Sequence, residues 1–318
     1  MSSETMSSTA IKRLGLGFLL FYCVASAALQ VAPDAPATTL PARTIQGYLM
    51  IVSARINDQG PFDFLVDTGT NSTLIDLALA KQLALQAKDK LQLSSLAKSA
   101  AVSRYFLQKF NVGPASVSNL EALAVPLTQL TALDHKIRGV LGMNFLLQFS
   151  FRLDFDHQLM ELYPFPEDAT VPAGLRVPVT INESRLLVTV ASDAAPHGSW
   201  KLALDSGICQ ALVFEQRIEK RIVAGSRFAQ ASRMMQVSTN LAEHMASTVQ
   251  LKNISIADAH LPQMEVVILK NDLQKPSDPQ DGLLPAVAFH SVFFDRSNAT
   301  LIFSPSPETA SMASIQKH

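Results

Sequence analysis

The chain has 318 residues, enough for two average domains of about 150 residues each. Its 26 basic and 27 acidic side chains nearly cancel, which argues against a nucleic-acid partner because such binders carry a basic excess. Hydrophobic residues make up 48% of the chain and cysteines number only 2, which excludes a disordered chain, a disulfide-dense scaffold and a cysteine-only zinc module.

Residues 1–28 have the features of an export signal. Lys12 and Arg13 supply a positive start, and an apolar run occupies 14–24. Ala25-Ser26-Ala27 follows and suits a signal peptidase. The apolar run is shorter than the about 20 residues that a membrane span needs. We expect cleavage and a secreted or periplasmic protein, with an uncleaved membrane anchor and a buried helix as the alternatives.

Residues 29–45 are rich in proline, alanine and threonine and are interpreted as a linker or a lead-in strand. No later segment approaches 18 uninterrupted apolar residues, so no membrane span is expected after the signal is removed. Residues 307–318 are expected to form a flexible tail.

Short alternating apolar runs, broken by glycine, proline, asparagine and aspartate, predict a mainly β protein. Phe62, Phe64 and Val66 alternate on one expected strand. Asp76 then stands where an N-cap would begin a helix over 77–86.

Further along the chain, Val177, Val179 and Ile181 alternate on another expected strand, and Leu251, Ile254 and Ile256 do so in part. A second short helix is predicted over 215–224, ending near Gly225.

An internal repeat organises the chain. Residues 60–69 (GPFDFLVDTG) align without a gap with residues 198–207 (GSWKLALDSG), so that Asp67 and Asp205 are 138 positions apart. The 139–142 motif (GVLG) then aligns with 282–285 (GLLP). Chance hardly explains several landmarks recurring in one order.

Later landmarks extend the repeat. Residues 150–154 (SFRLD) align with 291–295 (SVFFD), and Pro164 with Pro305. The sequence therefore predicts an all-β fold of two homologous lobes, 46–166 and 170–306, with a cleft between them.

Each repeated Asp-(Thr/Ser)-Gly ends an apolar strand, where glycine allows a sharp turn. Asp67 and Asp205 can then meet across a pseudo-twofold axis and share one proton, because two adjacent carboxylates cannot both ionise easily. Such a pair can deprotonate a water and protonate a carbonyl. A lone Asp-Thr-Gly is more commonly a simple turn, and two unrelated turns are the alternative interpretation.

Hydroxyl groups beside the two aspartates complete the predicted site. Thr68 and Ser206 are expected to bond the opposite loop's backbone and hold the loops in register. Gly69 and Gly207 would support them, and the apolar pairs 140–141 and 283–284 would pack beneath.

These motifs resemble the pepsin-like and retropepsin-like aspartic peptidases, and most of all the secreted two-lobed aspartyl proteases of bacteria. The resemblance covers about 45–306. It is carried by 64–76 (FLVDTGTNSTLID), 139–146 (GVLGMNFL), 202–214 (LALDSGICQALVF) and 281–285 (DGLLP). It implies two six-stranded-type barrels with the cleft between them, and Asp67 and Asp205 as the catalytic pair.

The chain departs from the family pattern near both aspartates. Thr70 carries a hydroxyl that could bond the outer oxygen of Asp67, whereas its counterpart Ile208 cannot, so we predict an asymmetric pair. Retropepsins also have an apolar residue there. Pro285 replaces the glycine found at 142 and lacks an N–H, so the support beneath Asp205 must differ. Cys209, next to Ile208, is interpreted as a small buried hydrophobe rather than a reactive thiol.

The family's flap corresponds to residues 94–106, which contain no glycine for a tight tip. Tyr105 is a candidate substrate-binding ring in that flap, and a strand residue facing the core is the alternative.

The sequence thus predicts a monomeric aspartic endopeptidase that acts on peptides or proteins and needs no cofactor or metal. Its histidines are scattered and form no metal motif. Two alternatives stay open: a catalytically weak or inactive peptide-binding protein of the same fold, and a narrow protease that processes itself within 29–45.

Overall fold

The computed structural model describes residues 38–94, 99–164, 171–192, 195, 198–214, 233–238, 243–269 and 279–304. The predicted signal, the expected helix over 215–224 and the tail at 307–318 lie outside this part of the chain. Within it, no helix is long and apolar enough to cross a membrane.

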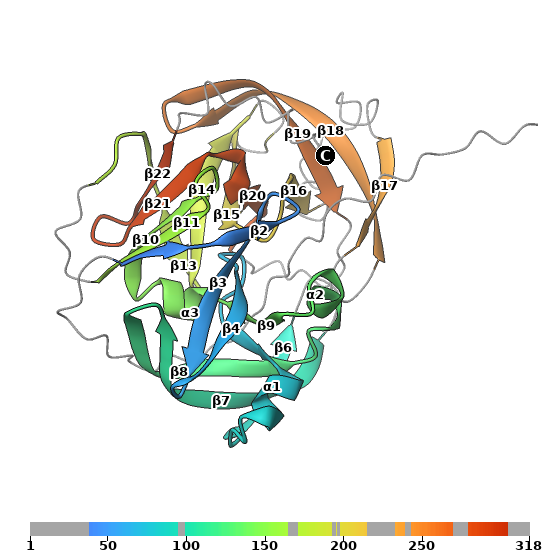
Figure 1. The fold of residues 1–318 in the computed structure, drawn as a ribbon. Coiled ribbons are helices and arrows are strands. Elements are labelled where there is room, and N and C mark those ends of the chain that lie inside the picture. Colours follow the sequence, from blue (N-terminus) through green and yellow to red (C-terminus); the bar gives the residue numbers. More distant parts are fainter. Residues whose placement is uncertain are drawn as a thin grey trace, which may run out of the picture.

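The first lobe is built on one mixed sheet of eight strands (Figure 1). In spatial order it contains β2 (Arg43–Ile45), β3 (Leu49–Ile56), β4 (Gln59–Val66), β9 (Ile137–Leu141), β5 (Thr73–Asp76), β8 (Ala115–Val125), β7 (Ser99–Val112) and β6 (Asp89–Ser94). Three short helices accompany it: α1 (Leu77–Gln82), α2 (Thr128–Leu133) and α3 (Met143–Leu146).

The second lobe repeats this sheet strand for strand. Its order is β13 (Thr180–Asn182), β14 (Arg185–Ala191), β15 (Ser199–Asp205), β20 (Gly282–Pro285), β16 (Ala211–Phe214), β19 (Ala259–Leu269), β18 (Glu243–Ile256) and β17 (Arg233–Ser238). A 3-10 helix, η3 (Ala286–Ala288), stands where the first lobe has α3.

The directions of pairing also repeat between the lobes. β4 runs parallel to β9, as β15 does to β20. β5 runs parallel to β8 and antiparallel to β9, as β16 does to β19 and β20. The predicted all-β fold of two duplicated lobes is therefore confirmed.

A third sheet, called the central sheet below, joins the lobes. Its order is β1 (Thr38–Pro41), β11 (Leu159–Pro164), β10 (Phe149–Asp154), β21 (Ser291–Asp295), β22 (Thr300–Ser304) and β12 (Leu175–Pro178). β10 and β21 pair antiparallel at its centre, one strand from each lobe, so the sheet itself has a pseudo-twofold axis.

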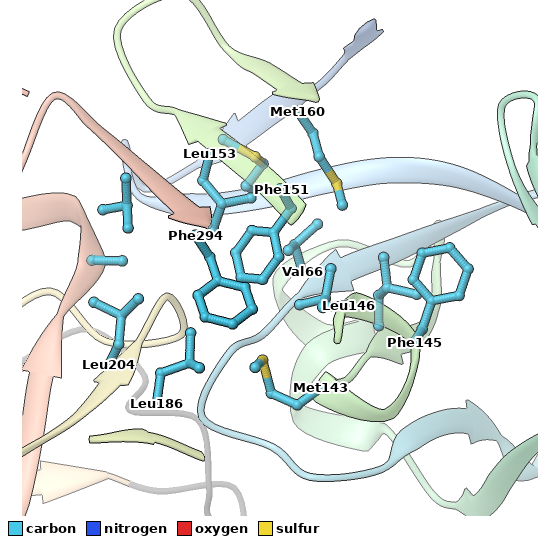
Figure 2. Packing of buried hydrophobic residues seen from close by; sticks show 14 of the residues in the cluster. Val66, Met143, Phe145, Leu146, Phe151, Leu153, Met160, Leu186, Leu204 and Phe294 are labelled. Carbon is cyan, nitrogen blue, oxygen red and sulfur yellow. The ribbon is translucent and has the colours of Figure 1, made fainter. Parts of the chain in front are cut away.

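The core beneath the candidate site gathers around the central sheet (Figure 2). Phe151 of β10 and Phe294 of β21 are fully buried, with ring centroids 5.5 Å apart. Val66 and Leu204 pack in the same cluster, and each directly precedes one of the repeated aspartates. Burial of these side chains fixes the strands that carry the aspartates.

The end of β4 is buried on both faces. Phe64 and Val66 belong to the cluster around the central sheet, and Leu65 packs in a second cluster on the opposite face. The predicted alternation is present, but here it separates two cores rather than a core from solvent.

The strand predicted from Val177, Val179 and Ile181 is wrong in one respect. Val177 is buried in β12 of the central sheet, whereas Ile181 is 44% exposed in β13, at the edge of the second-lobe sheet. The chain changes sheets between these strands, which a run of alternating residues cannot reveal.

The predicted helix after Asp76 begins where expected and is shorter than predicted. α1 ends at Gln82 because Ala84 adopts a left-handed backbone with φ of 49°. Asp76 makes no side-chain cap; its carboxylate lies 3.7 Å from the guanidinium of Arg138 instead.

Candidate active site

The two repeated aspartates lie side by side where the loops of the two lobes meet. Asp67 follows the end of β4 and Asp205 ends β15, and both are fully buried. Each Oδ1 accepts a hydrogen bond from the glycine two residues later, at 2.8 Å from the Gly69 N–H and 2.7 Å from the Gly207 N–H. The same turn thus aims both carboxylates.

Thr68 and Ser206 bind each other's loops reciprocally. The Thr68 hydroxyl donates to the Leu204 carbonyl at 3.0 Å, and the Ser206 hydroxyl donates to the Val66 carbonyl at 2.9 Å. Each hydroxyl also accepts the other residue's backbone N–H at 3.0 Å. These four buried bonds cross from lobe to lobe and fix the spacing of the two loops.

Contact between the two loops is close enough to demand glycine at 69. A Cβ on Gly69 would lie 2.4 Å from Oδ2 of Asp205. The two carboxyl groups lie close enough for each to influence the pKa of the other. Both Oδ2 atoms are buried and accept from no N–H or O–H group of the described residues.

Burial dominates the electrostatics of the pair. Desolvation raises the pKa of Asp67 to about 7, against the lowering effect of the backbone N–H groups of Gly69 and Thr70 and of Asp205. Desolvation and the charge of Asp67 together raise the pKa of Asp205 well above its usual range. The pair therefore binds protons more strongly than two exposed aspartates would.

Thr70 and Ile208 make the two loops unequal, though not by the predicted contact. The Thr70 hydroxyl donates to the Ser72 carbonyl at 3.5 Å, and it is the Thr70 backbone N–H that bonds Asp67. The expected hydroxyl bond to the carboxylate is thus replaced by a backbone bond. Ile208 is buried and packs among apolar side chains.

A polar network supports the first loop. The Oδ1 of Asn144 in α3 accepts hydrogen bonds from both the backbone N–H and the hydroxyl of Thr73, each at 2.8 Å. The side-chain NH2 of Asn144 donates to the Glu121 carbonyl at 2.8 Å. The Met143 N–H also donates to the Thr70 carbonyl at 2.9 Å. These bonds tie the loop after Asp67 to α3 and β8.

The second loop has a different support. Pro285 pairs in register with Asp205 and cannot donate a backbone hydrogen bond, as predicted. Val287 stands at the position that Asn144 holds in the first lobe. Leu283 and Leu284 are buried beneath, like Val140 and Leu141 in the first lobe.

Two buried polar residues near Asp205 were not predicted from the sequence. Tyr48 reaches from the first lobe, shares a side-chain hydrogen bond with Cys209 and lies close enough to Asp205 for the charge of that carboxylate to help raise the pKa of its phenol. Arg185 of β14 is fully buried, and its charge lowers the pKa of Asp205. Neither follows a motif, because both lie far from the aspartates in sequence.

Tyr105 does not line the candidate site. It is 8% exposed, pairs with Ala122 across β7 and β8, and packs in the core. The structure thus favours the core-facing alternative. The predicted flap, 94–106, includes the last residue of β6 and the first half of β7, and residues 95–98 between them lie outside the described residues.

No group of histidine, cysteine, aspartate or glutamate side chains suited to a metal ion occurs among the described residues. The polar chemistry at the floor of the site is that of the carboxyl pair and its hydrogen-bonding neighbours.

Comparison with known proteins agrees with this geometry. Residues 52–145 match the aspartyl protease family, and this range includes Asp67 and the 139–142 motif. The predicted resemblance to the aspartyl proteases is confirmed. The match ends before the second lobe, whose likeness to the first is instead carried by the shared strand order.

Solved structures with similar folds include an aspartic proteinase. An aspartic proteinase from Irpex lacteus is 13% identical, with a TM-score of 0.50 over 87% of this chain and 99% of that one. Basic 7S globulin from soybean is 13% identical, with a TM-score of 0.48 over 90% of this chain and 100% of that one.

A retropepsin-like aspartic protease from Rickettsia conorii is 19% identical, with a TM-score of 0.29 over 44% of this chain and 96% of that one. No curated protein gives a significant match.

Proposed function

We propose that this protein is an aspartic endopeptidase that hydrolyses peptide bonds with a water held between Asp67 and Asp205. The observation that carries the proposal is the buried carboxyl pair, in which each group influences the pKa of the other and whose loops are held by reciprocal bonds from Thr68 and Ser206.

The chemistry follows from one shared proton. The ionised carboxylate takes a proton from the water while the protonated carboxyl donates to the peptide carbonyl, so the water oxygen bonds to the carbonyl carbon. The resulting diol then collapses, the C–N bond breaks, and the amine leaves with a proton from the pair. No covalent enzyme intermediate or cofactor is needed.

Several further features belong to this proposal. Duplication within one chain supplies the twofold relation that a dimer would otherwise provide, which favours a monomer. The signal-like residues 1–28 favour a secreted or periplasmic enzyme. Because burial raises the pKa of Asp67 to about 7, the single-proton form of the pair builds up as pH approaches neutrality, which favours activity near neutral pH rather than in strong acid.

The test is cleavage of a denatured protein by the purified mature form between pH 4 and 7, an interval spanning roughly the usual and raised carboxyl pKa values. Asp67→Asn and Asp205→Asn should each abolish cleavage, because one carboxyl can no longer exchange its proton. Asp58→Asn is the matched control, since that side chain is 74% exposed on a turn of the first lobe. Persistent cleavage by Asp67→Asn would refute the mechanism.

A peptide-binding protein without activity is the second candidate, favoured by Pro285 and Ile208 in the second loop. Tight binding of a statine-type transition-state mimic by the wild type, lost in Asp205→Asn, would argue against it. Cleavage confined to the protein's own residues 29–45, detected by mass spectrometry, would instead indicate a self-processing protease.

A further inference from the structure

Arg185 is a buried charge in an unusual place. It begins β14 directly after a tight turn in which Glu183 and Ser184 have left-handed φ values of 47° and 61°. Residues beside such turns are commonly exposed, yet Arg185 is 0% exposed. Burying a guanidinium is costly unless an opposite charge compensates it.

The strand register places that charge opposite Asp205. β14 and β15 pair antiparallel, with Leu187 opposite Ala203 and Val188 opposite Leu202. Continuing this register by two positions brings Arg185 opposite Asp205, at the ends of the same two strands. Directly opposite residues of an antiparallel pair project from the same face of the sheet.

The first lobe has no such charge in the equivalent place. β3 and β4 pair with Ile51 opposite Leu65, so the same continuation brings Leu49 opposite Asp67. Leu49 is apolar and fully buried. Both lobes therefore have a buried side chain at this position, and only the one in the second lobe is charged.

The groups around Asp205 make Arg185 the buried cation of the site. The other groups close to Asp205 are Asp67, Tyr48 and the Cys209 that lies beside Tyr48. Tyr48 is neutral because burial raises the pKa of its phenol. Glu183 is the other partner of Arg185, at 3.7 Å from its Nη1, but the Glu183 side chain is 41% exposed. Solvent therefore weakens the attraction between Arg185 and Glu183 more than the attraction between Arg185 and Asp205.

We propose that Arg185 is a positioning residue of the carboxyl pair, whose buried guanidinium opposite Asp205 sets the pH range over which the pair carries a single proton. The inference rests on the proposed function of the pair. Arginine is always charged, so this influence is present at every working pH.

The direction of the effect follows from Coulomb attraction. A fixed positive charge favours every ionised form of the pair, so it moves both proton losses of Asp67 and Asp205 to lower pH. This explains how Asp205 can take part in a single-proton pair although burial and Asp67 both oppose its ionisation. Removing the charge should move the whole single-proton range upward.

The experiment is a carboxyl titration by NMR of protein labelled with carbon-13 at the aspartate carboxyls, with Asp67→Asn and Asp205→Asn assigning the signals. In Arg185→Met, which keeps the length of the side chain, both steps should move up by about one to three pH units. Arg185→Lys keeps the charge and should titrate close to the wild type. An unchanged titration in folded Arg185→Met overturns the proposal.

A second variant leaves Arg185 in place, in case Arg185→Met does not fold. Glu183→Gln removes the exposed partner of Arg185, so more of the guanidinium charge should act on Asp205 and the titration should move to lower pH. An upward shift of the titration in Glu183→Gln contradicts the proposal.

Peptide cleavage supplies an independent measurement. If the protein is a peptidase, both limbs of the pH profile of kcat/KM should move upward in Arg185→Met, whereas a purely structural defect would lower activity without moving them. The titration itself needs no catalysis, so absence of cleavage would refute the proposed function and leave the test of Arg185 intact.

Discussion

At the residue scale, Thr68 and Ser206 show how small hydroxyls position two lobes. Each hydroxyl donates to one backbone group and accepts from another, all of them buried. Loss of one hydroxyl therefore leaves both a carbonyl and an N–H of the opposite loop without their partner, which costs more than the bond itself.

We predict that Ser206→Ala lowers the free energy of unfolding by about 1–3 kcal/mol and lowers peptidase activity more steeply, because the carboxyl spacing is lost. Ser206→Thr restores the hydroxyl that the first lobe uses at Thr68 and should recover most of both losses. Urea unfolding and peptide cleavage measure them. Equal stability of Ser206→Ala and wild type would contradict this role.

The carboxyl pair also links stability to pH. The pKa of Asp67 is raised to about 7 and that of Asp205 is raised too, so the folded protein binds more protons than the unfolded chain above the ordinary range of aspartate. The contribution to stability is full below about pH 4 and is lost as pH rises toward the folded pKa values.

We therefore expect the free energy of unfolding to fall as pH rises from about 4 to 7. The fall should be about 1.4 kcal/mol per pH unit for each proton that the folded pair still holds. Asp205→Asn should flatten this decline and be more stable than the wild type at about pH 7, since a buried carboxyl is replaced by a neutral amide. Asp58→Asn should follow the wild-type curve. Thermal unfolding of the wild type and both variants over the same pH range measures these differences.

Sequence reasoning located the residues of the site that follow a local motif. Asp67 and Asp205, with the hydroxyls and glycines after them, are recognisable because the repeat aligns them. Arg185 and Tyr48 escaped prediction because their proximity to Asp205 depends on strand register and on contact between lobes. Thr70 was predicted to bond the carboxylate through its hydroxyl, but its side chain turns to Ser72 and its backbone does so instead.

At the element scale, the two loops are supported by unlike means. α3 holds the first loop through Asn144, whereas η3 presents Val287 at the same place. Hydrogen bonds restrict orientation more strictly than apolar contacts do, so the first loop has the more closely defined geometry.

We predict that Asn144→Val, which copies the second lobe, costs about 2–3 kcal/mol, because the N–H and hydroxyl of Thr73 and the Glu121 carbonyl lose their partners. Asn144→Asp keeps the oxygen that accepts from Thr73 but turns a carboxylate oxygen toward the Glu121 carbonyl, so it should be destabilised as well. Hydrogen exchange of the Thr73 amide should accelerate in Asn144→Val. Unchanged exchange there would show that the network does not hold the loop.

Element boundaries were less predictable than the repeat. The apolar run after Asp76 extends past Gln82, but the left-handed turn at Ala84 ends α1. Alternation in β18 is interrupted because Asn253 has a φ of 54°, which shifts the inward positions from Leu251 to Ile254. The irregularity at Ala84 leaves no mark in hydrophobic periodicity, and the one at Asn253 appears in the sequence only as an interrupted alternation.

At the scale of the whole molecule, the central sheet makes the two lobes one unit. β10 and β21 pair across the pseudo-twofold axis, and Phe151 packs on Phe294 below the loops of the aspartates (Figure 2). Neither lobe alone would bury these rings or complete this sheet.

We predict that Phe151→Ala destabilises the protein by about 3–5 kcal/mol and also lowers activity, because the cavity lies beneath Val66 and Leu204. Phe106→Ala, at a half-buried ring of β7 away from the central sheet, is the control and should cost less. Denaturant unfolding monitored by the single tryptophan, Trp200, measures both. Similar losses for the two variants would contradict a special role of the central sheet.

The reciprocal bonds of Thr68 and Ser206 have a mechanical consequence. Because they join the loops of the two lobes, any hinge motion of one lobe against the other at this point would have to break buried bonds. The carboxyl pair is therefore held in a fixed position. If the protein is the proposed peptidase, a bound peptide would have to adapt to this fixed pair, and adjustment during binding would fall to parts of the chain away from it.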